Sequence, residues 1–256
     1  MLTSLSAHAL ALFVTCAAVA TVAQKLTGFA FTLLLLGLGG VMNVAPVADL
    51  ANAATVLSLA TAWSVLSQGR RGIDFGIWRS TVWGSLIGVV AGLLLLGWLQ
   101  ANLLAALKLM LGVTVMGCAG SLLLARKSQS SPSSHLSFVA YGLLSGLLGG
   151  LFAASGPPLV YHLYRQPLAV EIMRNTLVTA LSVISLSRLV LVVGTGGFSM
   201  QAVALCLIAA PIVLAISFLM NRGFAAIPRA MVLRAVSAIL VVTGIALCAQ
   251  AIRQLA

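Results

Sequence analysis

The sequence predicts an all-α polytopic membrane protein. It further predicts two homologous repeats of inverted topology, each with an interrupted short-helix hairpin followed by three transmembrane helices. Hydrophobic residues make up 61% of the chain and charged residues 7%, apolar runs recur from end to end, and the second half repeats the pattern of the first. A soluble chain of this length needs far more charge to cover its surface. The chain is therefore expected to be a multi-pass protein of the cell membrane.

One stretch, from Gly142 to Pro167, interrupts its hydrophobic run with Gly156, Pro157 and Pro158. A helix cannot pass through this pair of prolines intact, because Pro158 lacks a backbone N–H and both rings clash with the preceding turn. At membrane depth, irregular backbone survives only when it is buried in protein or lines a cavity. Such broken segments form the binding sites of transporters, and the helix N-terminus after the break offers N–H groups to an anion.

The first half has a similar interruption. Apolar residues 5–23 are separated by QKLTG (24–28) from FAFTLLLLGLGGVM (29–42). Each limb is shorter than the ~20 residues of a full crossing, so a re-entrant hairpin and two short crossings both remain open. A span at 47–66, a polar loop at 67–79, and spans at 80–98 and 103–124 joined by a turn GWLQAN are expected to follow.

The second half repeats this order after a hydrophilic linker. The expected division is a first repeat at 1–127, a cytoplasmic linker at 128–135 and a second repeat at 136–256. At an offset of about 123 residues, Asn52 falls on Asn175 and Asp49 lies close to Glu171. Internal duplication of this kind is typical of secondary transporters.

Loop charges indicate that the two halves are inverted. The loop with Arg70, Arg71 and Arg79 is basic and its counterpart GTGGFS (194–199) is uncharged, whereas GWLQAN is uncharged and its counterpart carries Arg222 and Arg229. Under the positive-inside rule, 67–79 and 125–135 are cytoplasmic and 194–199 faces outward. The net charge of +11 is scattered between hydrophobic runs, so it indicates topology and not a nucleic-acid partner.

Two segments carry a family resemblance: SGLLGGLFAASGPPLVYHL, and RNTLVTALSVISLSRLVLVVGTG after it. They resemble the second repeat of the TauE/SafE, sulfite exporter-like family of membrane permeases, which reads roughly G-x-x-G-G-x-F-G-x-G-G-P-P, then Arg-x-Thr, then a further arginine. The matching residues are Gly146, Gly149, Gly150, Gly156, Pro157, Pro158, Arg174, Thr176 and Arg188, with Gly28 and Phe29 in the looser first-repeat pattern KLTGFAF. The chain departs from the pattern at Ala153 and Ala154, where the family tends to have glycine.

The resemblance implies movement of a small sulfur oxyanion or organosulfonate across the cell membrane. We expect a permease that works by alternating access, without a cofactor or metal and without enzyme activity. A non-transporting membrane subunit or a channel is the alternative, and an intramembrane enzyme is disfavoured because HExxH and GxSxG are absent from the sequence. The expected partners are the lipid bilayer and the anion. A coupling proton or sodium ion and a homodimer stay open, and no nucleic acid is expected.

Cationic residues are the first candidates for the substrate site. Arg188 lies well inside its span, where a charged side chain is costly to insert and therefore suggests a function. It would bind an anion through its planar guanidinium group. The alternative is that its side chain snorkels to the outer interface. Lys25 beside Gly28 in the first break would attract the anion or merely flank an interface. Asn52, Asn175 and Thr176 are expected beside the substrate, with interhelical hydrogen bonding as the alternative.

Three further ionisable residues are candidates for proton coupling. His162 follows the second break by about one helical turn and titrates near neutral pH, although a packed histidine is the commoner finding. Asp49 and Glu171 precede the two equivalent asparagines, where each would tune a gate or simply cap its helix.

Overall fold

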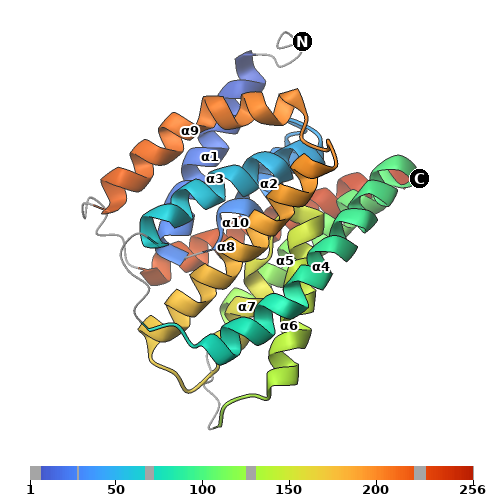
Figure 1. The fold of residues 1–256 in the computed structure, drawn as a ribbon. Coiled ribbons are helices and arrows are strands. Elements are labelled where there is room, and N and C mark those ends of the chain that lie inside the picture. Colours follow the sequence, from blue (N-terminus) through green and yellow to red (C-terminus); the bar gives the residue numbers. More distant parts are fainter. Residues whose placement is uncertain (1–6, 28, 67–71, 125–130, 222–228, 256) are drawn as a thin grey trace.

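The computed structural model describes residues 7–27, 29–66, 72–124, 131–221 and 229–255, which form ten α-helices (Figure 1). The helices of the first half are α1 (Ala7–Thr27), α2 (Phe31–Val41), α3 (Val47–Leu66), α4 (Phe75–Asn102) and α5 (Leu104–Leu124). Those of the second half are α6 (His135–Phe152), α7 (Gly156–Leu163), α8 (Val170–Gly194), α9 (Met200–Asn221) and α10 (Arg229–Leu255). The all-helical prediction is confirmed for these residues.

The same order of elements occurs in both halves. Each half has a longer helix, a short helix after a break, and three further helices. The starts of α2 and α7 are 125 residues apart, as are those of α4 and α9 and of α5 and α10, while α3 and α8 start 123 residues apart. The loops after α3 and α8 also contain positive-φ glycines, Gly72 (φ 80°) and Gly196 (φ 69°), where a side chain would be strained.

The described loops between the helices lie at two opposite ends of the bundle, where hydrogen bonds join them to each other and to the helix ends. At the linker end, Ser133 N donates to Gln166 Oε1 (2.9 Å) and Asp74 N donates to Thr176 Oγ1 (3.1 Å). At the far end, Lys108 Nζ donates to Asn43 Oδ1 (3.1 Å), and the loop before α9 bonds to the start of α3. We use "linker end" and "far end" for these two poles below.

Three expected boundaries were wrong. Residues 24–27, expected in the first break, form the last turn of α1. Gly97–Asn102, the expected turn, is helical and belongs to α4; the chain reverses at Leu103, whose N–H still donates to Leu99 O at 2.8 Å. Residues 75–79, expected in the polar loop, form the first turns of α4, because the Asp74 carboxylate accepts from Ile77 N at 3.0 Å and caps the helix.

The second break lies before the prolines. Ala153 ends α6 in the left-handed region (φ 54°), and its N–H donates to Gly149 O. Helix α7 then starts at Gly156 with prolines at its second and third positions, where the fixed φ of proline suits a helix start. These positions carry no N–H, so α7 offers an anion fewer backbone donors than the sequence suggested.

Six glycines hold α4 against α6. Gly84, Gly88 and Gly92 alternate with Gly142, Gly146 and Gly150, four residues apart on each helix. A Cβ added to any of them would lie 2.1 to 2.5 Å from a backbone carbonyl oxygen of the facing helix. The two backbones therefore touch directly, as small residues permit in membrane helices. This glycine seam fixes the register of the two helices.

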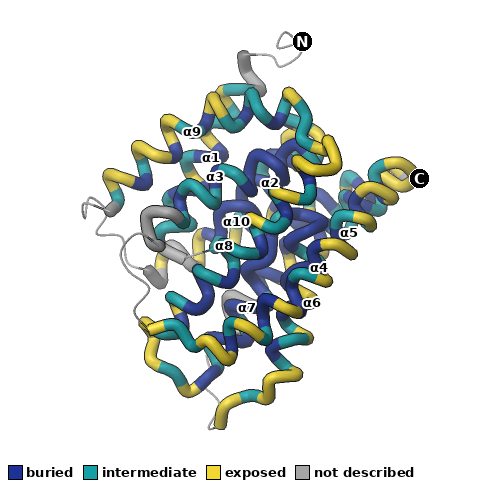
Figure 2. Tube along the Cα trace, in the orientation of Figure 1, coloured by how far each residue is buried: buried dark blue, intermediate teal, exposed yellow. Residues whose placement is uncertain are grey.

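The outer surface of the bundle is apolar. Figure 2 shows exposed residues along the outer sides of α4 and α9, and on α4 these include Trp83, Ile87, Leu94 and Trp98. Five of the described helices are long and apolar enough to cross a membrane. The polar exterior of a soluble protein is replaced here by a surface suited to lipid, which makes the chain a multi-pass membrane protein.

Candidate anion site

Arg188 lies on α8 and is only 1% exposed. Its Nε donates to Gly150 O of α6 at 3.2 Å, and its Nη1 donates to Asn52 Oδ1 and Thr55 Oγ1 of α3, both at 2.9 Å. A single guanidinium thus joins both halves of the chain. The alternative in which Arg188 snorkels to the interface does not fit this burial.

The break in α6 supplies one of these acceptors. In a continuous helix, Gly150 O would accept from the N–H four residues on, but Ala154 N donates to Leu148 O instead. The carbonyls of the last turn are therefore left for other donors, and Arg188 Nε takes the one at Gly150. The positive charge also suits a helix C-terminus, where the helix dipole is negative.

The charge of Arg188 is not balanced by an acid in the described structure. Its three acceptors are neutral oxygens, and its Nη2 is buried without a hydrogen-bond partner among the described residues. The acids of the chain lie elsewhere: Asp49 bonds to Ser199, Asp74 caps α4 and Glu171 is exposed. A buried cation of this kind is costly unless an anion compensates it.

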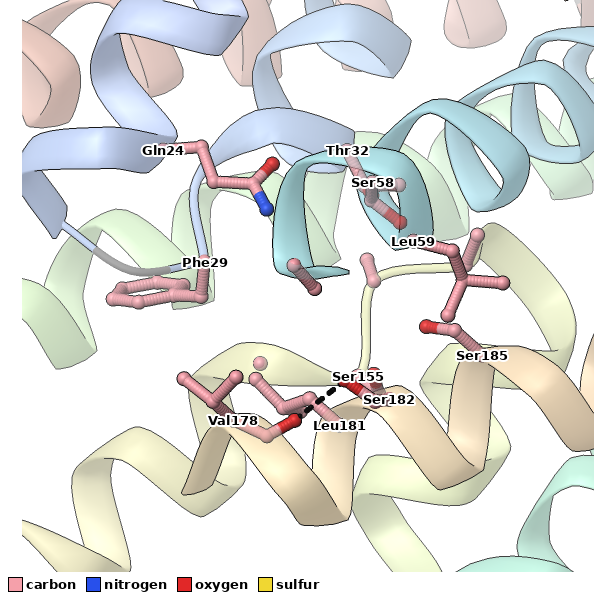
Figure 3. A pocket seen from close by; sticks show the side chains of 14 residues that line it. Gln24, Phe29, Thr32, Ser58, Leu59, Ser155, Val178, Leu181, Ser182 and Ser185 are labelled. Atoms are coloured by element: carbon pink, nitrogen blue, oxygen red, sulfur yellow. Dashed lines mark hydrogen bonds between the residues drawn. The ribbon is translucent and has the colours of Figure 1, made fainter. Parts of the chain in front are cut away.

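A small cavity lies one helical turn from Arg188 towards the linker end. Its volume is about 50 Å³, room for a small ion or a few waters. Both breaks contribute to its wall, and so do α3 and α8, whose serines face the space (Figure 3). The residues that line this central cavity are Gln24, Phe29, Thr32, Ser58, Leu59, Ala62, Ala153, Ala154, Ser155, Gly156, Val178, Leu181, Ser182 and Ser185.

Several polar groups of the central cavity can take part in binding. Gln24 Oε1 is buried without a partner among the described residues. Ser182 Oγ donates to Val178 O at 2.8 Å, and Ser58 Oγ donates to Thr55 O at 3.0 Å. The free positions on these groups are acceptors, so they can hold the water around an anion, whereas an oxyanion oxygen needs a donor, which a serine hydroxyl supplies only when it turns away from its carbonyl.

The structure brings some of the expected site residues together. Asn52 bonds to Arg188, and Gly156 lines the central cavity beside the buried Pro157 and the half-buried Pro158. Lys25 follows Gln24 in the last turn of α1 and lies within electrostatic range of Arg174. Gly28 lies outside the described residues.

Asn175 and Thr176 do not meet Arg188. They lie more than three turns before it on α8, near the linker end, where Thr176 Oγ1 accepts from Asp74 N. Glu171 is exposed in the first turn of α8. The two asparagines that the 123-residue offset aligns in sequence therefore lie towards opposite ends of the bundle.

His162 is buried at the linker end of the α6–α7 hairpin. Its ring stacks on Tyr141 (centroids 4.1 Å apart) and meets Phe138 edge-on at 4.6 Å, while Nε2 lies 3.1 Å from Ser137 Oγ. His162 does not line the central cavity; its contacts instead pack α7 against α6.

Sequence reasoning missed Thr55, Gln24 and the serines of the cavity. A signal was present, since Ser182, Ser185 and Arg188 follow one another at three-residue spacing, as do Asn52, Thr55 and Ser58. Residues three apart share a helix face. The spacing shows two polar faces, although it cannot show that they meet.

The fold and this site define a polytopic helical membrane protein with a buried cation beside two helix breaks. The family model described as "Sulfite exporter TauE/SafE" matches residues 12–247, so the chain belongs to this family of exporters. A relative from Cupriavidus necator, described as "Probable sulfite/organosulfonate exporter TauE", is 30% identical over 201 residues, 78% of each chain. No solved structure matches.

Proposed function

We propose that the chain is a secondary transporter for a small anion, a sulfur oxyanion or an organosulfonate, and that Arg188 binds it. The single observation that carries the proposal is the buried guanidinium with neutral partners and an unbonded Nη2. An anion on Nη2 would compensate the charge with a charge-assisted hydrogen bond. The substrate class is the one named for the Cupriavidus necator relative.

Alternating access between two inverted repeats is the mechanism that we propose. The recurrence of element starts at 123 and 125 residues supports it, as does the position of the cavity between both breaks. The linker end would be cytoplasmic, so an anion would enter the central cavity past Lys25 and Arg174, whose charges attract it.

Substitution of Arg188 tests the binding role. Arg188→Lys keeps the charge but loses the planar fork, and Arg188→Gln loses both. A charge-assisted bond contributes about 1.5–3 kcal/mol, so we expect at least tenfold weaker sulfonate binding in Arg188→Gln and a smaller loss in Arg188→Lys. Titration calorimetry on purified protein in detergent measures the affinity, and vesicle uptake measures transport.

Arg234→Gln is the matched control, because Arg234 is exposed on α10 and the charge change is the same. Its affinity should equal that of the parent. Parental sulfonate affinity in Arg188→Gln would contradict the proposed site.

A further inference from the structure

The Asn52 side chain connects Arg188 to the far-end loop. Its Oδ1 accepts from Arg188 Nη1 at 2.9 Å, and its Nδ2 donates to Gly197 O at 3.1 Å. Gly197 belongs to the loop between α8 and α9. One carboxamide therefore bonds at the same time to the buried cation and to the loop between α8 and α9.

The same loop is fastened to α3 a second time, about one turn earlier. Ser199 Oγ donates to Asp49 Oδ1 at 2.6 Å and also accepts from Ala202 N, which caps α9. Asp49 is buried. Both contacts hold the loop onto the face of α3 that carries Asn52.

These contacts separate two cavities. The central cavity lies on the linker side of Arg188 and is reached by Ser58 and Ser185. A second cavity of about 450 Å³ lies on the far side; Asn52, Thr195 and Gly197 line its inner wall, and it also borders Leu94 and Trp98 on the outer side of α4. From the linker end to the far end, α3 and α8 therefore pass first the central cavity, then Arg188 with its partners, and then the far-end cavity.

We infer that Asn52 is the gating residue of transport: it closes the far-end route while it bonds to Arg188, and it opens that route when an anion takes its place. The inference rests on the proposed function. An anion is a stronger acceptor for a guanidinium than a neutral amide oxygen. An anion held by both Nη1 and Nη2 takes the Arg188 donor from Asn52 and repels Asn52 Oδ1, so the carboxamide turns away and its Nδ2 no longer reaches Gly197 O. Occupancy of the site is thus coupled to release of the loop.

Two substitutions that both weaken anion binding should have opposite effects on the gate. In Asn52→Asp, a carboxylate stands permanently on Arg188 as a bound anion would, and it cannot donate to Gly197 O. In Arg188→Gln, the cation is gone and Asn52 keeps its donor for Gly197. We expect the far-end route to be open in Asn52→Asp and closed in Arg188→Gln.

The readout is labelling of Ser185→Cys in the central cavity by a membrane-impermeant maleimide applied from outside, with the four native cysteines replaced. We expect labelling at least tenfold faster in Asn52→Asp than in the parent, and within twofold of the parent in Arg188→Gln. Asn102→Asp, the same change at an exposed position on α4, should match the parent. Equal rates in Asn52→Asp and Asn102→Asp would overturn the inference.

A second variant keeps the test decisive if Asn52→Asp does not fold. Ser199→Ala removes the hydrogen bond to Asp49 and leaves Arg188 and Asn52 in place. Labelling of Ser185→Cys should then be a few-fold faster than in the parent, while the sulfonate affinity is retained. An unchanged rate would overturn the gate. Failure of the proposed function is separate, since it is seen as parental anion affinity in Arg188→Gln, whatever the labelling rates are.

Discussion

Ala153 has a backbone conformation that favours glycine. Its φ of 54° lies in the left-handed region, where Cβ approaches the carbonyl oxygen and costs about 1–2 kcal/mol. The position is the helix end at which glycine is commonest. The sequence showed alanine where the family tends to have glycine, and the structure shows that the backbone keeps the glycine-like turn all the same.

We therefore expect Ala153→Gly to stabilise the protein. Glycine relieves the left-handed strain of the folded backbone, but it also gives the unfolded chain more conformational entropy. The first effect is slightly larger, so the free energy of unfolding should rise by about 1 kcal/mol or less. The midpoint of thermal unfolding in detergent should rise by a few degrees. A lower midpoint than that of the parent would contradict this account of the turn.

At the scale of elements, the glycine seam links helix packing to the anion site. Gly92 lies against Gly150, whose carbonyl accepts from Arg188, and a Cβ on Gly92 would come 2.3 Å from Leu147 O. Because backbone atoms cannot move aside as a side chain can, any added methyl group must push α4 and α6 apart. The seam therefore sets where Arg188 finds its acceptor.

Gly92→Ala should destabilise the fold by about 1–3 kcal/mol and weaken anion binding as Gly150 shifts. Gly97→Ala is the matched control on the same helix, because a Cβ there has nothing within 4 Å of the described structure. That change should be neutral or stabilising, since alanine favours helix. Thermal unfolding and calorimetry measure both effects, and equal stability of the two variants would exclude a tight seam.

At the scale of the whole molecule, the loops that the charge pattern assigns to opposite sides of the membrane lie at the two opposite poles of the bundle. Ser131 precedes the linker-end contact between Ser133 and Gln166, whereas Gly196 lies in the far-end loop. Both are exposed. In an inverted-repeat protein with a cytoplasmic linker, these two positions face opposite sides of the membrane.

An impermeant thiol reagent applied to intact cells should label Gly196→Cys and leave Ser131→Cys unlabelled until the membrane is permeabilised. The native cysteines are replaced in both variants. Labelling of both positions from the same side would exclude the inverted arrangement and would favour parallel repeats.

The sequence by itself determined the membrane class, the helix breaks and the family. Composition alone requires a lipid-facing surface, two adjacent prolines in an apolar run cannot stand in a helix interior, so a break must lie close to them, and the glycine–proline pattern is local. These features depend on neighbouring residues, so they survive without knowledge of the fold. The bounds of α4 were not predicted, because capping by Asp74 and a chain reversal at Leu103 decide where this helix starts and ends.

Only the tertiary structure decided which polar groups meet Arg188. Asn52 and Thr55 lie 136 and 133 residues away from it in the chain, and Gly150 lies 38 residues away. Asn175 and Thr176 share the helix of Arg188 and yet lie towards the other end. The register between two helices is set by the packing of surfaces that are distant in sequence, above all at the glycine seam. It therefore cannot be read from the residue spacing of one helix alone.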